Sequence, residues 1–383
     1  MIPKKLQNKL DSRKNENAFR QLGQANTLVD FSSNDYLGFS KSKPIFNNAH
    51  HYLLDNNLSQ NGATGSRLLS GNHSLYHKVE QQISTYHNAK NALIFNSGYD
   101  ANLGFFSCIP QRHDIIFYDE YCHASIRDGI KMSNAKAYKF KHNDVDSLEK
   151  EILRLGFNDN EMYVITESVF SMDGDSPDLK TLSTICKKYK ANLIIDEAHA
   201  IGVFGHIGNG KVCELQLENQ VFARIITFGK ALGCHGAAIL GSTELKDYLI
   251  NFSRPFIYTT ALPPHSLATI KASYNELVIE SAGKESQLEH LKKNIQFFNS
   301  EIKRLQLQHL FIDSNSSIHC CIICGNEQVK HISEALKHRG FDVKAILSPT
   351  VPKNQERLRF CIHSYNTTQQ ITNVLELLTT FAF

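Results

Sequence analysis

Lys230 lies in the segment IITFGKALG, directly after a short apolar run and between Gly229 and Gly233. An amine at the end of a buried strand is partly desolvated, which lowers its pKa and makes it a nucleophile toward aldehydes. A solvated lysine in a surface loop is the common alternative, and Lys230 alone does not separate the two interpretations.

Asp196 follows the apolar run Leu193–Ile195, and His199 comes three residues later. A carboxylate at the end of a buried strand needs a cation or a metal ion as its partner. A pyridinium nitrogen is such a cation, and a carboxylate that keeps this ring protonated preserves the electron sink that pyridoxal phosphate (PLP) offers beside a lysine. Asp196 could instead cap a helix, and His199 could be a structural histidine.

His123, in the segment DEYCHASIRDG, could stack over such a cofactor ring. Asp119, Glu120 and Cys122 precede it, but their spacing matches no standard zinc arrangement, so no metal site is predicted. Gly98 and Tyr99 follow another apolar run and can open a helix whose free N–H groups hold a phosphate, although an ordinary tight turn would leave the same pattern.

These residues all follow short apolar runs, and the runs themselves predict the fold. Runs of four or five apolar residues that alternate with helical segments are typical of parallel strands covered on both faces. In such a sheet, ligands bind beyond the carboxyl ends of the strands, so the residues above should gather at one edge. The expected strands are Ala92–Phe95, Ile115–Tyr118, Tyr163–Thr166, Leu193–Ile195, Arg224–Phe228 and Ala237–Leu240.

The pattern divides the chain into three parts. Residues 1–41 read as a polar helix followed by an extended segment, residues 42–279 as the large α/β domain, and residues 280–383 as a smaller α+β domain. In the last part, a charged helix is followed by the strand-like SIHCCIIC, a second helix, the strand-like LRFCIHSY and a final helix.

Composition excludes several classes of protein. The chain has 383 residues, a net charge of +3 and 42% hydrophobic residues, which argues against a general nucleic-acid binder and against a disordered chain. No apolar run approaches the length that spans a bilayer, and the charged first twenty residues do not resemble a secretory signal. Nine scattered cysteines fit a reducing compartment, so we expect a cytoplasmic protein.

Three other motifs suggest chemistry but fit poorly. The segment GHIGNGKV, Gly205–Val212, has phosphate-loop spacing but lacks the Ser or Thr that binds Mg²⁺. Cys321 and Cys324 have no second ligand pair and lie in an apolar run, which favours a buried strand. Arg357 and Arg359 could be surface charges, or one of them could bind a substrate carboxylate with its forked guanidinium.

Five motifs taken together resemble the α-oxoamine synthases, and they occur in the family's order over nearly the whole chain. They are FSSNDYLG from Phe31, HASIRDG from His123, TESVFSMDGD from Thr166, DEAHAIGVFG from Asp196 and TFGKALG around Lys230. This family contains fold-type I PLP enzymes that condense an amino acid with an acyl thioester. The resemblance therefore implies PLP as the cofactor, a mainly parallel sheet with helices on both faces, and a homodimer that shares its active site between subunits.

The resemblance also implies roles for individual residues. Lys230 looks like the lysine that carries the cofactor aldehyde and removes the Cα proton, and Asp196 looks like the partner of the pyridine nitrogen. His123 is similar to the histidine stacked on the ring, and His199, with Ser171, resembles the pair that contacts the ring 3′-oxygen. The role of Glu167, which lies beside these residues, stays open.

The remaining implied contacts concern the phosphate and the substrates. Phosphate-binding positions are matched by Gly98, Tyr99 and Thr227, and by Thr259 or Thr260 acting toward the neighbouring subunit. Asn34 and Arg359 match binders of the amino-acid carboxylate, and Ser66 fits a pocket with room for a methyl group.

Within the family, SMDGDSPDL and TFGKALGCHGA favour the branch that joins alanine to a pimeloyl thioester, of coenzyme A or of a carrier protein, with loss of CO₂. Glycine acetyltransferase and serine palmitoyltransferase activity are the alternatives on the same scaffold. A partner-binding subunit without catalysis is disfavoured, because such subunits typically lose the cofactor-binding lysine, whereas this chain retains Lys230.

Overall fold

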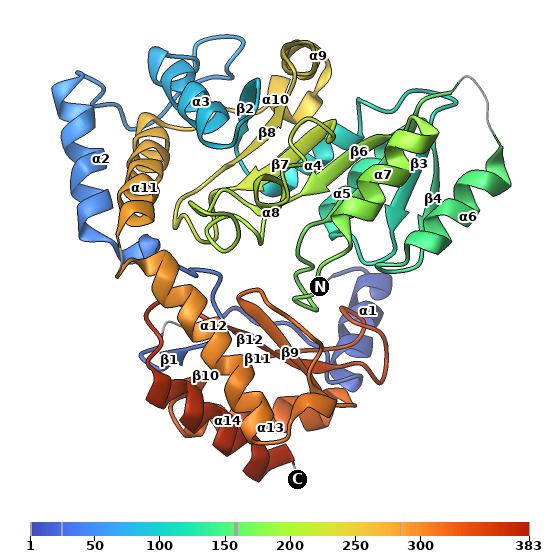
Figure 1. The fold of residues 1–383 in the computed structure, drawn as a ribbon, viewed down its shortest axis with the longest axis vertical. Coiled ribbons are helices and arrows are strands. Elements are labelled where there is room, and N and C mark those ends of the chain that lie inside the picture. Colours follow the sequence, from blue (N-terminus) through green and yellow to red (C-terminus); the bar gives the residue numbers. More distant parts are fainter. Residues whose placement is uncertain (1, 24–25, 157–159, 284, 383) are drawn as a thin grey trace. The chain divides into compact units, whose positions relative to one another are not determined.

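The computed structural model describes residues 2–23, 26–156, 160–283 and 285–382 (Figure 1). They form two compact units. The larger comprises residues 35–171 and 176–289, and the smaller comprises residues 1–34, 172–175 and 290–383. The sequence predicts boundaries after residues 41 and 279, whereas the units change at Asn34/Asp35 and Glu289/His290. The first segment belongs with the C-terminal part because β1 (Val29–Asp30) pairs with β10 (Phe341–Asp342).

The larger unit is built on a seven-stranded sheet in the order β2-β8-β7-β6-β5-β3-β4. Strand β8 runs antiparallel to both of its neighbours and the other strands are parallel to one another. The strands are β2 (Asn91–Phe95), β3 (Ile115–Asp119), β4 (Lys136–Phe140), β5 (Met162–Glu167), β6 (Asn192–Asp196), β7 (Ala223–Thr227) and β8 (Ala237–Gly241).

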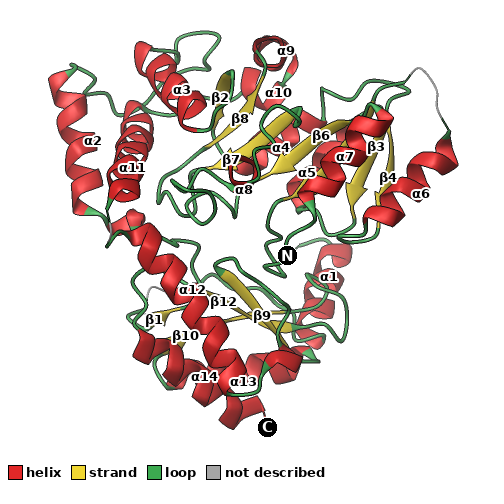
Figure 2. Ribbon diagram, in the orientation of Figure 1, coloured by secondary structure: helices red, strands yellow, loops and turns green. Residues whose placement is uncertain are grey.

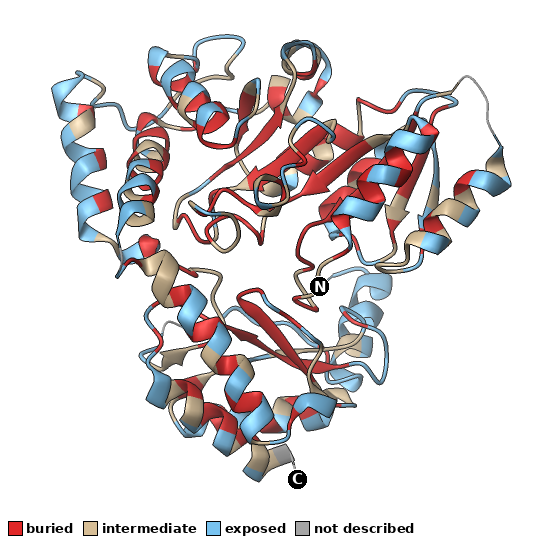
Figure 3. Cartoon of the chain, viewed as in Figure 1, coloured by how far each residue is buried: buried red, intermediate tan, exposed pale blue. Residues whose placement is uncertain are grey.

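Helices cover both faces of this sheet (Figure 2). Alternate residues of each strand point to opposite faces, so Ile194 packs into one core and Leu193 and Ile195 into the other. One face is covered by α4 (Gly98–Phe106), α5 (Ala124–Met132), α9 (Thr243–Phe252) and α10 (Arg254–Ile257), and the other by α6 (Val145–Leu155), α7 (Leu179–Tyr189) and α8 (Lys211–Glu214). Figure 3 shows the consequence, a buried sheet under helices whose outer faces are exposed.

This architecture confirms the predicted mainly parallel sheet and all six expected strands. The sequence analysis missed β4, because its residues KAYKF include two exposed lysines and do not form an apolar run. Strand β4 lies at the edge of the sheet, beside β3 only, so it does not need two buried faces. A further group of helices, α2 (Lys43–Asp55), α3 (Ser74–Tyr86) and α11 (Pro264–Ala282), packs together next to β2.

The smaller unit contains a three-stranded antiparallel sheet in the order β11-β12-β9 and the two-stranded pair β1-β10. Its elements are α1 (Lys4–Asn15), β9 (Ile318–Ile322), α13 (Asn326–His338), β11 (Lys344–Ile346), β12 (Arg357–Cys361) and α14 (Thr368–Ala382), and α12 (Gln287–Arg304) leads into it. This matches the predicted α+β character of the C-terminal part.

Residues 172–175 belong to the smaller unit although their neighbours in sequence do not. Arg357 of β12 donates hydrogen bonds to the Met172 carbonyl (2.9 Å) and to the Asp173 carboxylate (2.5 Å). The hydroxyls of Ser314 and Ser316 donate to the Gly174 carbonyl at 2.8 and 2.9 Å. No helix in the described part of the chain is long and apolar enough to cross a membrane.

Candidate functional site

The carboxyl ends of β2, β3, β5, β6 and β7 lie at one edge of the larger unit's sheet, because these five strands are parallel. This edge receives the residues that follow the apolar runs, as predicted from the sequence. Glu167 ends β5 and Asp196 ends β6, and the two residues are direct neighbours in the register of the sheet.

Asp196 is 5% exposed, and its carboxylate is bound only by uncharged donors. The side-chain amide of Asn102 donates to Oδ2 at 2.8 Å, and the backbone N–H of Ala198 donates to Oδ1 at 2.9 Å. Within the described residues, no lysine, arginine or histidine nitrogen lies within 4.0 Å of this carboxylate. A buried carboxylate in this state is a ready partner for a cation that arrives with a ligand.

Glu167 is also buried, at 3% exposure. Its Oε1 accepts a hydrogen bond from the backbone N–H of His123 at 2.6 Å. Burial raises the pKa of Glu167 well above its usual value, and the neighbouring Asp196 charge raises it further. Glu167 therefore anchors the backbone at His123, and its own carboxyl group favours the neutral form beside Asp196.

His123 is the N-cap residue of α5, and its Nδ1 accepts hydrogen bonds there. The hydroxyl of Ser125 lies 2.7 Å from Nδ1, and the backbone N–H of Ser125 lies 3.3 Å from it. The residue as a whole is exposed, so a flat ring of a ligand can reach it. Desolvation on its inner side lowers the pKa of His123, and the charge of Lys230 lowers it further.

His199 is 5% exposed and its Nδ1 lies 2.7 Å from the hydroxyl of Tyr36, which is fully buried. This contact fixes the orientation of the imidazole ring and turns Nε2 away from Tyr36. Ser171, the other residue expected near the 3′-oxygen of the ring, follows β5 in the same unit and is partly buried.

Lys230 follows β7 in a tight turn closed by the Gly233 N–H, which donates to the Lys230 carbonyl at 2.8 Å. The Lys230 charge lowers the pKa of both His123 and Glu167, so its amine lies within electrostatic reach of both groups. Gly233, in the left-handed region at φ +62°, allows the turn to approach the backbone of Phe39 and Ser40, where a Cβ would collide.

The N-terminus of α4 lies where the sequence predicts that a phosphate binds. Ser97 caps this helix by accepting from the Asp100 N–H at 3.1 Å, and the amides of Gly98 and Tyr99 have no acceptor inside the helix. Thr227, at the end of β7, lies beside them. A Cβ on Gly98 would be 3.6 Å from the Thr227 hydroxyl oxygen.

Thr259 and Thr260 lie next to this position within the same chain. The side-chain amide of Asn96 donates to the Thr259 hydroxyl at 3.0 Å and to the Thr260 carbonyl at 2.7 Å. Ser66 lies in a neighbouring loop. The Gly65 carbonyl in this loop accepts a hydrogen bond from the Ala261 N–H at 2.9 Å.

Asn34 and Arg359 lie in the smaller unit and are bonded to each other, with Arg359 Nη2 donating to Asn34 Oδ1 at 3.0 Å. Arg359 is 6% exposed. Arg357, two positions earlier, is engaged by Asp173 and the Met172 carbonyl, so the structure gives the two arginines of the RLR segment different tasks.

Sequence reasoning did not find Asn102, Ser125 or Tyr36, which contact the predicted site residues. Asn102 follows Gly98 by four positions and shares its face of α4, so helical spacing could have identified it. Tyr36 lies in the SNDYLG motif, where an aromatic ring gives no sign of a polar role.

Other parts of the molecule are less suited to chemistry. No group of three or more histidine, cysteine, aspartate or glutamate side chains in the described residues could hold a metal ion. Asp119 is bonded instead to His142 Nδ1 and to the Asn143 N–H, each at 2.9 Å. Cys321 lies inside β9, as predicted, and burial raises its pKa to about 12. The prediction was wrong for Cys324, which is exposed and lies beyond the end of this strand.

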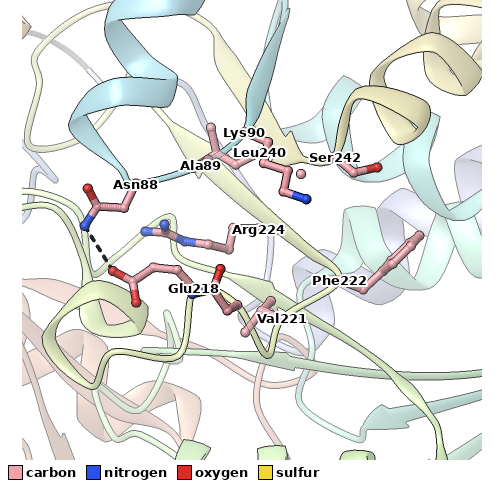
Figure 4. A pocket seen from close by; sticks show the side chains of 11 residues that line it. Asn88, Ala89, Lys90, Glu218, Val221, Phe222, Arg224, Leu240 and Ser242 are labelled. Carbon is pink, nitrogen blue, oxygen red and sulfur yellow. Dashed lines mark hydrogen bonds between the residues drawn. The ribbon is translucent and has the colours of Figure 1, made fainter.

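A cavity of about 260 Å³ lies at the opposite edge of the sheet, near the starts of β2 and β7 (Figure 4). One of its three charged lining residues is Arg224, beside Lys90 and Glu218; Arg224 is 3% exposed and already bound by the Glu197 carboxylate at 2.6 Å and by the carbonyls of His87 and Asn209. Each nitrogen of Arg224 is therefore already engaged, and none of the residues predicted to do chemistry lines this cavity.

The chain is similar to known proteins over most of its length. The family described as Aminotransferase class I and II matches residues 26–378. The 8-amino-7-oxononanoate synthase of Emericella nidulans is 40% identical over 376 residues, which cover 92% of this chain and 89% of that relative.

Two solved structures show the same fold. The 8-amino-7-oxononanoate synthase from Francisella tularensis has a TM-score of 0.77 and 30% identity, over 92% of this chain and 97% of that one. A serine palmitoyltransferase from S. paucimobilis with bound PLP and myriocin has a TM-score of 0.87 and 26% identity, over 99% of this chain and 96% of that one.

Proposed function

Since the chain belongs to the aminotransferase class I and II family, and within it to the α-oxoamine synthases, we propose that it makes 8-amino-7-oxononanoate, a precursor of biotin. In this reaction the Cα of L-alanine forms a bond to the carbonyl carbon of a pimeloyl thioester. The C–S bond breaks, the thiol leaves, and the carboxylate of alanine is lost as CO₂ while a proton returns to Cα.

The residues at the carboxyl edge suit PLP, the cofactor of this family. Asp196 is a buried carboxylate with no cation beside it among the described residues. A protonated pyridine nitrogen would supply the cationic partner that such a carboxylate needs. The amides of Gly98 and Tyr99 at the start of α4 are suited to a phosphate, and the missing Cβ of Gly98 leaves room for it. These two features carry the proposal.

When bound, PLP supplies an aldehyde that reacts with amines and an electron-withdrawing ring that acidifies the Cα proton of the amino acid. Lys230 would hold the aldehyde and then act as the base that removes this proton. Asp196 would keep the ring nitrogen protonated, His123 would cover the ring, and His199 with Ser171 would hydrogen-bond the 3′-oxygen.

For the remaining contacts, we propose Thr227 as a further phosphate ligand, and Thr259 or Thr260 as a ligand of the phosphate in the neighbouring subunit. Ser66 would line the space for the methyl group of alanine. In the smaller unit, Arg359 would bind a substrate carboxylate in a charge-assisted pair, and Asn34, its hydrogen-bond partner, would fix the guanidinium for that purpose.

The proposed homodimer has support in exposed apolar side chains. Leu69 is 86% exposed and Tyr258 is 73% exposed, and their loops are joined by the bond from the Ala261 N–H to the Gly65 carbonyl. Exposed apolar side chains on joined loops can form a contiguous patch, and such a patch is typical of protein–protein contacts. All nine cysteines are free thiols, which supports the proposal of a reducing compartment such as the cytoplasm.

The decisive assay combines alanine, glycine and serine with pimeloyl, acetyl, succinyl and palmitoyl thioesters, and measures thiol release and product mass. We expect the alanine and pimeloyl pair to react fastest. The structural similarity to a serine palmitoyltransferase makes serine with palmitoyl thioester the second candidate, and preference for that pair would replace our assignment. Absence of thiol release from every pair would refute both.

Replacing the base tests the role of Lys230. Lys230→Ala should abolish turnover and the visible absorbance of lysine-bound cofactor, whereas Lys180→Ala, at an exposed position of α7, should leave both unchanged. Turnover retained by Lys230→Ala would contradict the proposed role.

A further inference from the structure

Asn102 joins two parts of the candidate site through one amide nitrogen. This side chain, 3% exposed on α4, has Nδ2 at 2.8 Å from Asp196 Oδ2 and at 3.1 Å from the Ser125 hydroxyl oxygen. The Ser125 hydroxyl lies in turn 2.7 Å from His123 Nδ1. A continuous line of hydrogen bonds therefore connects the carboxylate of Asp196 with the imidazole of His123.

The direction of each hydrogen bond in this line follows from the donors available. An amide nitrogen carries two hydrogens and accepts none, so Asn102 donates to both Asp196 and Ser125. The opposite orientation of the amide would place Oδ1 against the carboxylate of Asp196, two acceptors in contact. Oδ1 is buried and has no hydrogen-bond partner among the described residues, which is costly. Because the folded protein leaves this oxygen unpaired, the two hydrogen bonds that Nδ2 donates must stabilise the structure by more than this cost.

The Ser125 hydroxyl accepts from Asn102, so its own hydrogen is available for His123 Nδ1. The backbone N–H of Ser125 points to the same ring nitrogen at 3.3 Å. A ring nitrogen that accepts hydrogen bonds from two donors carries no proton of its own. His123 is consequently neutral, with its ring proton on Nε2.

We propose that Asn102 is a positioning residue that, through Asp196 and Ser125, holds His123 as the neutral Nε2–H tautomer. This inference rests on the proposed function for its meaning. A neutral imidazole covering a cationic pyridine ring avoids like-charge repulsion, so His123 does not work against Asp196, which keeps that ring protonated.

The charges around His123 agree with this geometry. Asp196 and Asp128 favour the protonated imidazole, while Lys230 and Arg127 oppose it, and desolvation on the inner side of the ring is the largest influence and also opposes it. Glu167, which contacts only the backbone of His123, favours its own neutral form and so contributes little negative charge.

The experiment is ¹⁵N NMR of the protein labelled at histidine, with and without PLP, using His123→Gln to assign the resonances. In the wild type at neutral pH we expect Nδ1 of His123 to resonate as an unprotonated nitrogen and Nε2 as a protonated one. A wild-type His123 that is protonated on Nδ1, or on both nitrogens, would overturn the proposal.

Two variants test the pathway. Ser125→Ala removes the hydroxyl and leaves only the longer backbone contact, so the tautomer ratio should shift about fivefold toward Nδ1–H, the effect of one ordinary hydrogen bond. Asn102→Leu should shift the ratio in the same direction and weaken PLP binding about tenfold or more, because Asp196 loses its amide donor. Asn294→Leu removes a buried amide in the smaller unit and should change neither readout.

Unchanged tautomer ratios in variants that remain folded would overturn the proposal, and Ser125→Ala decides alone if Asn102→Leu does not fold. The NMR measurement needs no turnover. A failed thiol-release assay would therefore refute the proposed function without touching this result, and the reverse also holds.

Discussion

Alanine in place of Gly98 should separate cofactor binding from folding. A Cβ at this position would lie 3.6 Å from the Thr227 hydroxyl oxygen and 3.7 Å from its Cβ, which are ordinary contacts, and φ of Gly98 is not in the left-handed region. The folded protein can thus accommodate the methyl group. Because alanine suits a helix better than glycine, the free energy of unfolding should stay equal or rise by up to about 1 kcal/mol.

Binding of PLP should respond in the opposite direction. The methyl group would fill the space between Gly98 and Thr227, where we place the phosphate. Loss of one charge-assisted hydrogen bond costs about 1.5 to 3 kcal/mol, which corresponds to a Kd about 10- to 150-fold higher. Titration of the cofactor-free protein with PLP, followed by tyrosine fluorescence because the chain has no tryptophan, measures this change.

Gly104→Ala, in the same helix, is the matched control. Its Cβ would lie 2.4 Å from the Ser253 hydroxyl oxygen and 3.1 Å from a ring carbon of Phe95, so this variant should be less stable to urea yet bind PLP normally once folded. If Gly98→Ala keeps both the stability and the PLP affinity of the wild type, then α4 does not hold the phosphate and our placement of the cofactor is wrong.

Three more predictions concern charge. Asp196→Asn should still bind PLP but slow exchange of the alanine Cα proton in D₂O by about 100-fold or more, and exchange at the normal rate would exclude its role. Arg224→Leu should lower the free energy of unfolding by about 3 to 5 kcal/mol in urea, because it leaves the Glu197 charge buried without a partner, and a loss below about 1 kcal/mol would contradict this. Burial raises the pKa of Asp30, but hydrogen bonds from Ser33 and Ser32 and the nearby His363 lower it to about 2 overall. The stability that Asp30 contributes to the folded state is therefore present above the unfolded pKa near 4 and is lost as pH falls toward 2. Asp30→Asn should accordingly cost about 1 to 2 kcal/mol at pH 7 and almost nothing at pH 2, and a cost that does not vary with pH would count against this explanation.

The sequence predicts the strands of the central sheet well because most of them are buried on both faces. The middle of a strand such as β6 (NLIID) must be apolar, and the change to Asp196 then marks its last residue. Strand β4 lacks this pattern because it lies at the edge of the sheet, where most of its residues, including both lysines, are exposed.

The strand-end residues of the candidate site could be predicted from the sequence, whereas the residues that contact and orient them could not. Parallel strands place their carboxyl ends together, so the amino-acid sequence alone assigns Asp196 and Lys230 to one edge of the sheet. Asn102, Ser125 and Tyr36 come from helices and a loop, and their contacts depend on how those elements pack. The transfer of residues 172–175 to the smaller unit likewise depends on contacts with Arg357, which no local sequence pattern indicates.

The smaller unit is assembled from three separate stretches of the chain, and this has a consequence for biosynthesis. Its strand β1 is made early, whereas its partner β10 follows only near the end; Ser32 and Asp342, which are hydrogen-bonded beside this pair, are 310 positions apart. The N-terminal segment therefore leaves the ribosome long before the surface that it pairs with exists. A fragment that starts at residue 290 would lack β1 and the Asp173 partner of Arg357, and we expect it not to fold alone.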